Sequence, residues 1–94
     1  MLLHINSSLS ELNSNLVKVG TFTGTTSRNG NVNLTINANK YKVLGGVITN
    51  IGGYIALHYV ALNRSGYFFH CVSDGAMENL SNTQVTIEYE YIAI

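Results

Sequence analysis

Turn-forming residues recur about every ten positions from Val19 to Ile94, and this spacing most constrains the fold. Between the turns, apolar residues follow a period of two, as they do from Val32 to Ile36. Such a period places alternate side chains on opposite faces of a strand. The pattern predicts an all-β fold, an antiparallel, jelly-roll-like β-sandwich whose exact strand order stays open. The expected strands are 17–23, 32–36, 41–51, 54–62, 67–73 and 83–94.

Glycine marks several of the expected joints. Asn29-Gly30, Ser65-Gly66 and Asp74-Gly75 are typical turn dipeptides, because glycine adopts a positive φ without steric cost. The pair Gly45-Gly46 lies inside an expected strand, where it indicates a bulge or the close approach of another backbone.

Two strand segments, 32–36 and 85–93, alternate between apolar and polar residues, which predicts one core face and one solvated face for each. The segments 54–62 and 67–72 do not alternate, and both of their faces are largely apolar. An antiparallel sheet tolerates such strands where something covers the second face. We expect a neighbouring subunit to provide that cover.

Apolar residues also recur through the first nineteen positions, at spacings of 3, 4, 3, 4 and 3. These spacings are typical of the a and d positions of a heptad repeat. The residues between them are mostly Asn and Ser, which are poor helix formers, so a helix here needs partner helices. Leucine at the a positions favours three strands or more over two. The heptad positions are Leu2, Ile5, Leu9, Leu12, Leu16 and Val19.

Both signals together predict two parts and a homotrimer. Residues 1–18 form a coiled-coil neck helix, and residues 19–94 form the β-sandwich head. For the first part the alternative is an amphipathic helix packed on its own domain.

Composition excludes several classes of partner. Only 11% of the residues are charged, against roughly 25% in an average globular protein. Five basic and five acidic residues cancel, so the chain lacks the basic stripe of a nucleic-acid binder, and we expect no nucleic acid as partner. Without eighteen consecutive apolar residues, or a basic segment followed by an apolar run at the start, we expect neither membrane insertion nor a secretory signal.

The residue pattern carries no catalytic motif, so we predict a non-enzymatic protein with no catalytic residue and no cofactor. Glu88 and Glu90 face one way on a strand, and a solvated face explains them better than a glycosidase pair. Cys71 lies in an apolar run and is expected in the core. His58 fits a hydrogen-bonded core or interface histidine better than a three-fold metal site, and we predict no metal.

Tyrosine and asparagine supply the remaining clue. The chain has six tyrosines and no tryptophan, and asparagine is its most frequent polar residue. A tyrosine ring offers an apolar platform for a sugar, and an amide matches sugar hydroxyls with a donor and an acceptor. Carbohydrate binding therefore suits this composition, although tyrosine is also common in strands.

A short Asn/Ser/Leu heptad segment, 8–16, runs directly into a Gly/Thr/Asn-rich β domain that ends in the strand 85–94. In style and architecture this resembles the C-terminal end of a tail-fibre or baseplate receptor-binding protein of a tailed bacteriophage or prophage. The resemblance implies a trimer with a coiled-coil neck and a head that binds host cell-surface polysaccharide. It also implies other tail or baseplate proteins as partners, and a location at the virion tail tip, or in the cytoplasm of the producing bacterium before assembly.

Strand direction predicts where a receptor site lies. If each strand reverses the one before, the joints 24–31, 52–53 and 74–82 fall at the end away from the neck, and the two longest joints are among them. Their polar residues, with Tyr54 as a ring platform, are the expected carbohydrate-binding set. The set is Arg28, Asn29, Asn31, Asn50, Tyr54, Asp74, Glu78, Asn79 and Asn82.

Two other classes of function stay open. A structural cap that trimerises a longer fibre would show the same heptads and the same apolar strands but would bind no glycan. A polysaccharide-degrading enzyme ranks third, because its acid pair should be buried with shifted pKa values, whereas the acids here are expected on exposed positions.

Overall fold

The computed structural model describes residues 16–52, 55–73 and 77–94. Within them the chain forms antiparallel β-strands and no helix, which confirms the all-β prediction. The strands are β1 (Lys18–Thr25), β2 (Asn31–Thr35), β3 (Tyr41–Ile48), β4 (Ile55–Asn63), β5 (Gly66–Ser73), β6 (Glu78–Asn79) and β7 (Gln84–Ala93).

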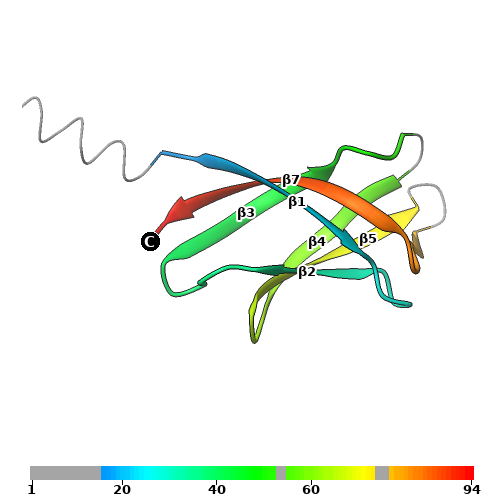
Figure 1. The fold of residues 1–94 in the computed structure, drawn as a ribbon, viewed down its shortest axis with the longest axis horizontal. Coiled ribbons are helices and arrows are strands. Elements are labelled where there is room, and N and C mark those ends of the chain that lie inside the picture. The colour runs from blue at the N-terminus through cyan, green and yellow to red at the C-terminus, as the bar shows by residue number, and fades with distance from the viewer. Residues whose placement is uncertain (1–15, 53–54, 74–76) are drawn as a thin grey trace, which may run out of the picture.

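The strands divide into two sheets (Figure 1). Sheet A has the order β1-β7-β3, so the last long strand lies between the first and the third. Sheet B has the order β2-β5-β4, and the short strand β6 also pairs with β5. Several neighbours in a sheet are therefore distant in sequence. The strands β4 and β5 are consecutive and form a hairpin across the two residues Arg64 and Ser65, and β6 follows β5 and pairs with it.

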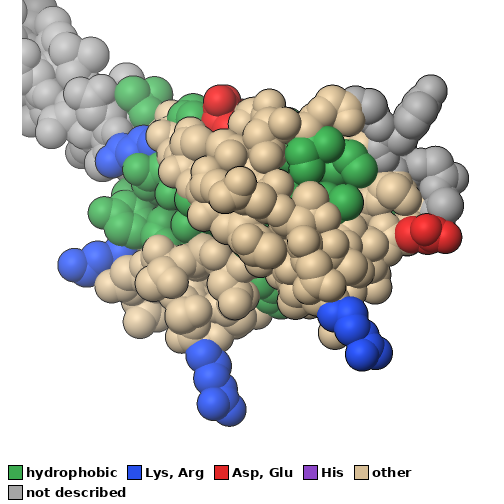
Figure 2. Space-filling view, turned by 45° about the vertical axis from the view of Figure 1, so that its right-hand side comes forward, with side chains coloured by type: hydrophobic (Ala, Val, Ile, Leu, Met, Phe, Trp, Pro, Cys, Tyr) green, Lys and Arg blue, Asp and Glu red, His purple; other side chains and the backbone are tan. Residues whose placement is uncertain are grey.

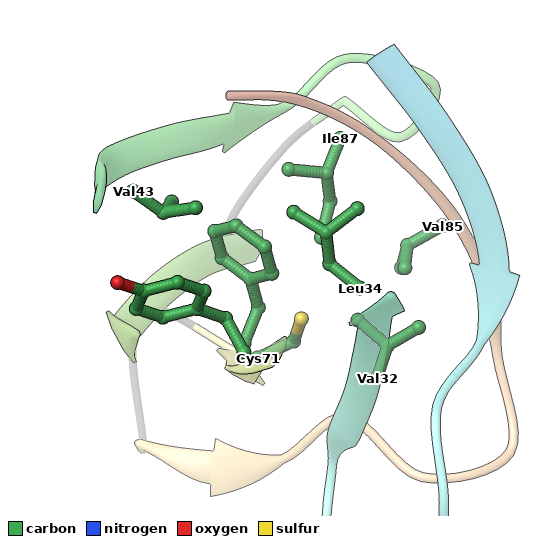
Figure 3. Packing of buried hydrophobic residues seen from close by; sticks show 8 residues of the cluster. Val32, Leu34, Val43, Cys71, Val85 and Ile87 are labelled. Atoms are coloured by element: carbon green, nitrogen blue, oxygen red, sulfur yellow. The ribbon is translucent and has the colours of Figure 1, made fainter. Parts of the chain in front are cut away.

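The inner faces of both sheets contribute to one hydrophobic core, in which their side chains point toward one another (Figure 3). Alternation explains which residues reach it. On β7, Val85 and Ile87 are fully buried while Glu88 and Glu90 are exposed, as their period of two predicts. The buried core consists of Val32, Leu34, Val43, Tyr67, Phe69, Cys71, Val85 and Ile87.

The six expected strands are present, with ends that differ by at most three residues. β3 ends at Ile48 rather than at residue 51. The backbone N–H of Thr49 still donates to the carbonyl of Thr86, and beyond it the side chain of Asn50 bonds to β7. β6 was expected to be loop. It has two residues, too few for any periodic pattern, and it forms by pairing with Ser73 and Val72 of β5.

The predicted neck of residues 1–18 is wrong at its C-terminal end. Leu16 and Val17 are not helical, and β1 begins at Lys18, so the heptad position Val19 lies in a strand. β1 pairs with β7 along its whole length, from Lys18 opposite Tyr91 onward, and this ladder outweighs the weak helix propensity of the segment. The heptad positions Leu2, Ile5, Leu9 and Leu12 lie outside the described residues.

Each of two facing edge strands carries a bulge. In β3 the register with β7 shifts between Val43 and Gly45, as the Gly45-Gly46 pair predicts. In β4 the register with β5 shifts between Leu57 and Tyr59, so His58 is an extra residue. β4 contains no glycine from which this bulge could be predicted. Leu57 and Val60 both pack against the core from opposite sides of this shift.

The β4 bulge corrects the interpretation of the segment 54–62. A strand of unbroken period would place Leu57 and Tyr59 on one face. Because His58 is extra, the phase changes there, and Tyr59 pairs with His70 on the outer face. Much of the missing alternation therefore reflects a change of phase within one strand, not two apolar faces.

Candidate functional site

The described parts of the joints after β1, after β3 and after β5 lie at one end of the molecule, opposite the start of β1, as the direction of the strands predicts (Figure 1). Thr26 connects two of them, and at 2% exposure it is fully enclosed. Its hydroxyl donates to the carbonyl of Leu80 at 2.5 Å and accepts from the backbone N–H of Thr83 at 2.9 Å. One buried threonine thus holds the segment after β1 against residues 80–83.

Three of the predicted site residues meet at this loop end. The carbonyl of Arg28 accepts a hydrogen bond from the Ser81 hydroxyl at 2.5 Å. The backbone N–H of Asn82 donates to the carbonyl of Ser27 at 3.2 Å. Asn29 lies in the same turn as Arg28, and the side chains of Arg28, Asn29 and Asn82 are exposed.

Other predicted residues are placed differently. Asn50 has both polar ends engaged by β7, since its Nδ2 donates to the carbonyl of Gln84 at 3.1 Å and its Oδ1 accepts from Thr86 at 2.7 Å. Glu78 is exposed on β6, opposite Ser73. Tyr54 and Asp74 lie outside the described residues.

Asn31 and Asn79 belong to the outer face of sheet B rather than to the loop tips. Asn31 is the register partner of His70. Asn79 Oδ1 lies 2.8 Å from Nε2 of the same histidine. Asn31 Oδ1 is buried and has no hydrogen-bond partner among the described residues. His70 therefore connects the predicted residues to a surface that the sequence did not predict.

Four rings cluster on this outer face. His70 has Tyr59 at a centroid distance of 5.0 Å and His58 at 5.2 Å, and Tyr59 contacts Phe68 edge-on at 5.9 Å. The Nδ1 atoms of His58 and His70 are 3.1 Å apart. His58 and Tyr59 are exposed, whereas Phe68 and His70 are half-buried. We call these four side chains the ring cluster.

Amides border the ring cluster on both sides. Asn79 lies beside His70, and Asn33 is the register partner of Phe68. Asn33 Oδ1 accepts a hydrogen bond from Nδ2 of Asn63 at 2.9 Å, so this amide is held in orientation. The outer face of sheet B thus combines aromatic rings with oriented amides in reach of solvent.

Charge is scarce on the outer face of sheet B, whereas Arg28 and Glu78 are exposed toward the loop end. The outer faces of β2, β4 and β5 carry no Asp, Glu, Lys or Arg side chain, and His58 and His70 are their only titratable nitrogen groups. Figure 2 turns the loop end toward the viewer and shows a largely uncharged surface with basic and acidic side chains at its margins. A neutral polar ligand suits these surfaces better than an anionic one.

The two bulges line a small pocket between the edges of β3 and β4. Its volume is about 200 Å³, and Leu44, Leu57 and Phe69 contribute apolar walls beside His58 and Tyr59. A second hollow of about 280 Å³ lies over Gly46, Val47 and the two glutamates of β7. Pockets that bind drug-sized molecules usually have a volume of about 300–1,000 Å³. Because both hollows are smaller, a ligand is expected to bind across the surface rather than inside a deep pocket.

Other groups offer little chemistry. Burial raises the pKa of the Cys71 thiol to about 11, so this sulfur stays protonated near neutral pH and behaves as a core side chain, as expected. In the described part of the chain no three His, Cys, Asp or Glu side chains are grouped to hold a metal. The same residues include no helix with the length and hydropathy to cross a membrane.

Sequence reasoning missed His58, Tyr59, Phe68, His70 and Asn33 as members of one surface. A signal existed for part of it, because Phe68 and His70 are two residues apart on one strand and Asn33 alternates with buried residues on another. The β4 bulge brings His58 and Tyr59 to the same face, and no residue pattern in the sequence predicts this bulge. Comparison of the chain with protein families, with curated proteins and with solved structures finds no match.

Proposed function

We propose that this chain is the receptor-binding head of a bacteriophage or prophage tail fibre or baseplate, and that it binds a neutral host cell-surface carbohydrate without catalysis. The observation that carries the proposal is the ring cluster with its bordering amides on the outer face of sheet B. The resemblance of the sequence to tail-fibre ends supports the biological setting, with the virion tail tip as location and other tail or baseplate proteins as partners.

The chemistry of the surface matches that of a sugar. Tyr59 and Phe68 present ring faces and edges on which the apolar face of a pyranose can rest. Asn33 and Asn79 each use Oδ1 within the protein, which leaves their Nδ2 groups as donors toward a ligand hydroxyl. Since the surface carries few charges, a neutral glycan is the preferred ligand class, and the exposed side chains of Arg28, Asn29 and Asn82 extend the contact at the loop end.

We also propose that the two sheets form a jelly-roll-like β-sandwich. In a jelly roll the first strand lies beside the last in one sheet, while the second strand lies in the other sheet. The orders β1-β7-β3 and β2-β5-β4 support this topology.

A homotrimer with a coiled-coil neck completes the proposal. The exposed apolar side chains of Val19 and Val47, whose register partners are Glu90 and Glu88, support a contact between copies through the outer face of sheet A. This assignment replaces the expected cover of the segments 54–62 and 67–72 by a neighbouring subunit, and it leaves the ring cluster on sheet B open to solvent, as glycan binding requires.

A structural trimerisation cap is the second candidate, favoured by the same exposed apolar side chains. It differs in one respect, since it predicts no affinity for any glycan. A polysaccharide-degrading enzyme is less well supported, because Glu88 and Glu90 are exposed on the face opposite the ring cluster.

The test is binding of the whole chain to purified host cell-wall polysaccharide, followed by NMR or calorimetric titration. We expect Tyr59→Ala to weaken binding on the order of tenfold, because stacking on an aromatic ring contributes about that much. Asn79→Ala should weaken it as well, through the lost amide. Leu62→Ala removes an exposed apolar side chain from the same strand, three residues away, and should leave the affinity unchanged.

The outcomes separate the candidates. If Tyr59→Ala lowers the affinity for the polysaccharide and Leu62→Ala does not, the binding site lies on the outer face of sheet B. If only Asn29→Ala lowers the affinity, the binding site lies at the loop end instead. Absence of binding by the unmodified chain would leave the structural cap as the better account.

A further inference from the structure

We propose that His58 and His70 form a binding site for a divalent transition metal ion, of the class of Zn²⁺, Ni²⁺ or Cu²⁺. The inference rests on the geometry of the two imidazoles and is independent of carbohydrate binding. It revises the expectation, drawn from the sequence, that the chain binds no metal.

The distance between the two nitrogens carries the proposal. Nδ1 of His58 and Nδ1 of His70 are 3.1 Å apart. Two nitrogens that bind one metal at about 2.0–2.1 Å, with tetrahedral or square-planar angles, lie roughly 2.9–3.4 Å from each other. The pair therefore already has the separation of two ligands that share one ion.

The hydrogen bond to Asn79 prepares His70 for this role. Asn79 Oδ1 can only accept, so Nε2 of His70 donates to it, across 2.8 Å. In the neutral ring, Nδ1 of His70 then carries a lone pair that points toward His58. An outer N–H bonded to an oxygen is the usual arrangement of a metal-binding histidine, because it fixes the tautomer and the ring orientation.

Metal binding requires that both Nδ1 atoms be free of hydrogen. With the lone pair on His70, Nδ1 of His58 holds the hydrogen of the contact between the two rings. A neutral imidazole carries its hydrogen on either nitrogen, so His58 exchanges to the Nε2–H tautomer and frees Nδ1. The neutral pair thus accepts the metal with no net release of protons.

The fold holds one ligand and leaves the other adjustable. His70 is half-buried on the central strand of sheet B and contacts the ring of Tyr59 at 5.0 Å. His58 is the extra residue of the β4 bulge, and its side chain is exposed. A small rotation of His58 directs both lone pairs at one ion, and water fills the remaining coordination positions.

The ligand chemistry sets the expected selectivity. Imidazole nitrogen suits Zn²⁺, Ni²⁺ and Cu²⁺, whereas Mg²⁺ and Ca²⁺ require oxygen ligands. Affinity should follow the usual order for divalent ions, with Cu²⁺ above Ni²⁺ and Zn²⁺. The described residues supply two ligands and no group of three, so the site is open rather than closed.

The experiment titrates Zn²⁺ into the full chain carrying His4→Gln, so that His58 and His70 are its remaining histidines. We expect one Zn²⁺ per chain by calorimetry, NMR shifts centred on the two imidazoles, and no response to Mg²⁺. His58→Gln and His70→Gln should each weaken binding by at least tenfold, because one ligand of two is lost.

The neighbouring amides provide matched variants. Asn79→Ala should weaken Zn²⁺ binding about tenfold, as loss of an outer partner usually does. Asn33→Ala, an exposed asparagine on the same face, should leave it unchanged. No binding by the His4→Gln chain, binding that survives His58→Gln, or a stoichiometry below one ion per chain would each overturn the proposal. His58 is exposed, so its variant is expected to fold, and thermal melting checks this.

Discussion

Replacement of Gly66 by alanine is expected to destabilise the fold by about 4 kcal/mol, from backbone strain and from overpacking, each of order 1–3 kcal/mol. Gly66 begins β5 with a φ of 146°, in a region that residues with a side chain rarely adopt. A Cβ here would lie 2.6 Å from the carbonyl oxygen of Leu34 and 2.7 Å from the backbone nitrogen of Ile36. The end of β2 crosses so close that either the hairpin or β2 must move.

The measurement is chemical denaturation of the variant and the unmodified chain at one protein concentration, since association affects apparent stability. Gly52→Ala is the matched control, because nothing lies within 4 Å of its added Cβ. We expect the Gly52 variant to unfold at nearly the same denaturant concentration as the unmodified chain. Equal effects of the two substitutions would contradict the close approach of β2 to Gly66.

Phe69→Ala is expected to cost about 3–5 kcal/mol, the usual range for loss of a large aromatic side chain from a core. Phe69 is fully buried on the inner face of sheet B. Its ring lies 5.7 Å from that of Phe22 and 6.5 Å from that of Tyr89, both on sheet A. Its removal leaves a cavity between the sheets, where the fold depends most on their contact.

The adjacent residue supplies the control. Phe68 is half-buried on the outer face of the same strand, so Phe68→Ala removes the same atoms from a partly solvated position. We expect the Phe68 variant to lose less than half the stability that the Phe69 variant loses, in parallel denaturation curves. A larger loss from Phe68 would show that the two faces of β5 are assigned the wrong way round.

The strands could be predicted where one face is core and the other is solvent. In β2 and β7 the period of two continues without interruption, so Leu34, Val85 and Ile87 were expected inside and Glu88 outside. The bulge in β3 was also predictable, because two successive glycines rarely occur in a regular strand. These features depend on local chain properties, which the sequence expresses directly.

The candidate surface could not be predicted in the same way. It depends on an extra residue at His58, and on pairing between strands β4 and β5 that this residue shifts. β6 could not be predicted either, because its two residues form a strand only by pairing with β5. This pairing places Asn79 beside His70. Asn50 was expected to bind a ligand, but its side-chain amide bonds to the backbone of β7 instead. Such outcomes are set by tertiary contacts rather than by local pattern.

The exposed apolar side chains of sheet A connect the fold to its proposed setting. Val19 and Val47 are more than half exposed, as are Leu16 and Val17 where the chain enters β1. Exposed apolar side chains on the outer face of a sheet are one feature of a contact with another chain. The proposed trimer and the proposed glycan surface on sheet B are therefore compatible, since the proposal assigns assembly to one sheet and binding to the other.

The most direct test of this account is the solution mass of the full chain, measured by multi-angle light scattering. The account predicts three times the mass of one chain. It also predicts that Val19→Glu with Val47→Glu lowers the mass to that of one chain, whereas Leu62→Glu, at a position that is also more than half exposed but on sheet B, leaves the trimer intact. A monomer for the unmodified chain at micromolar concentration would contradict it.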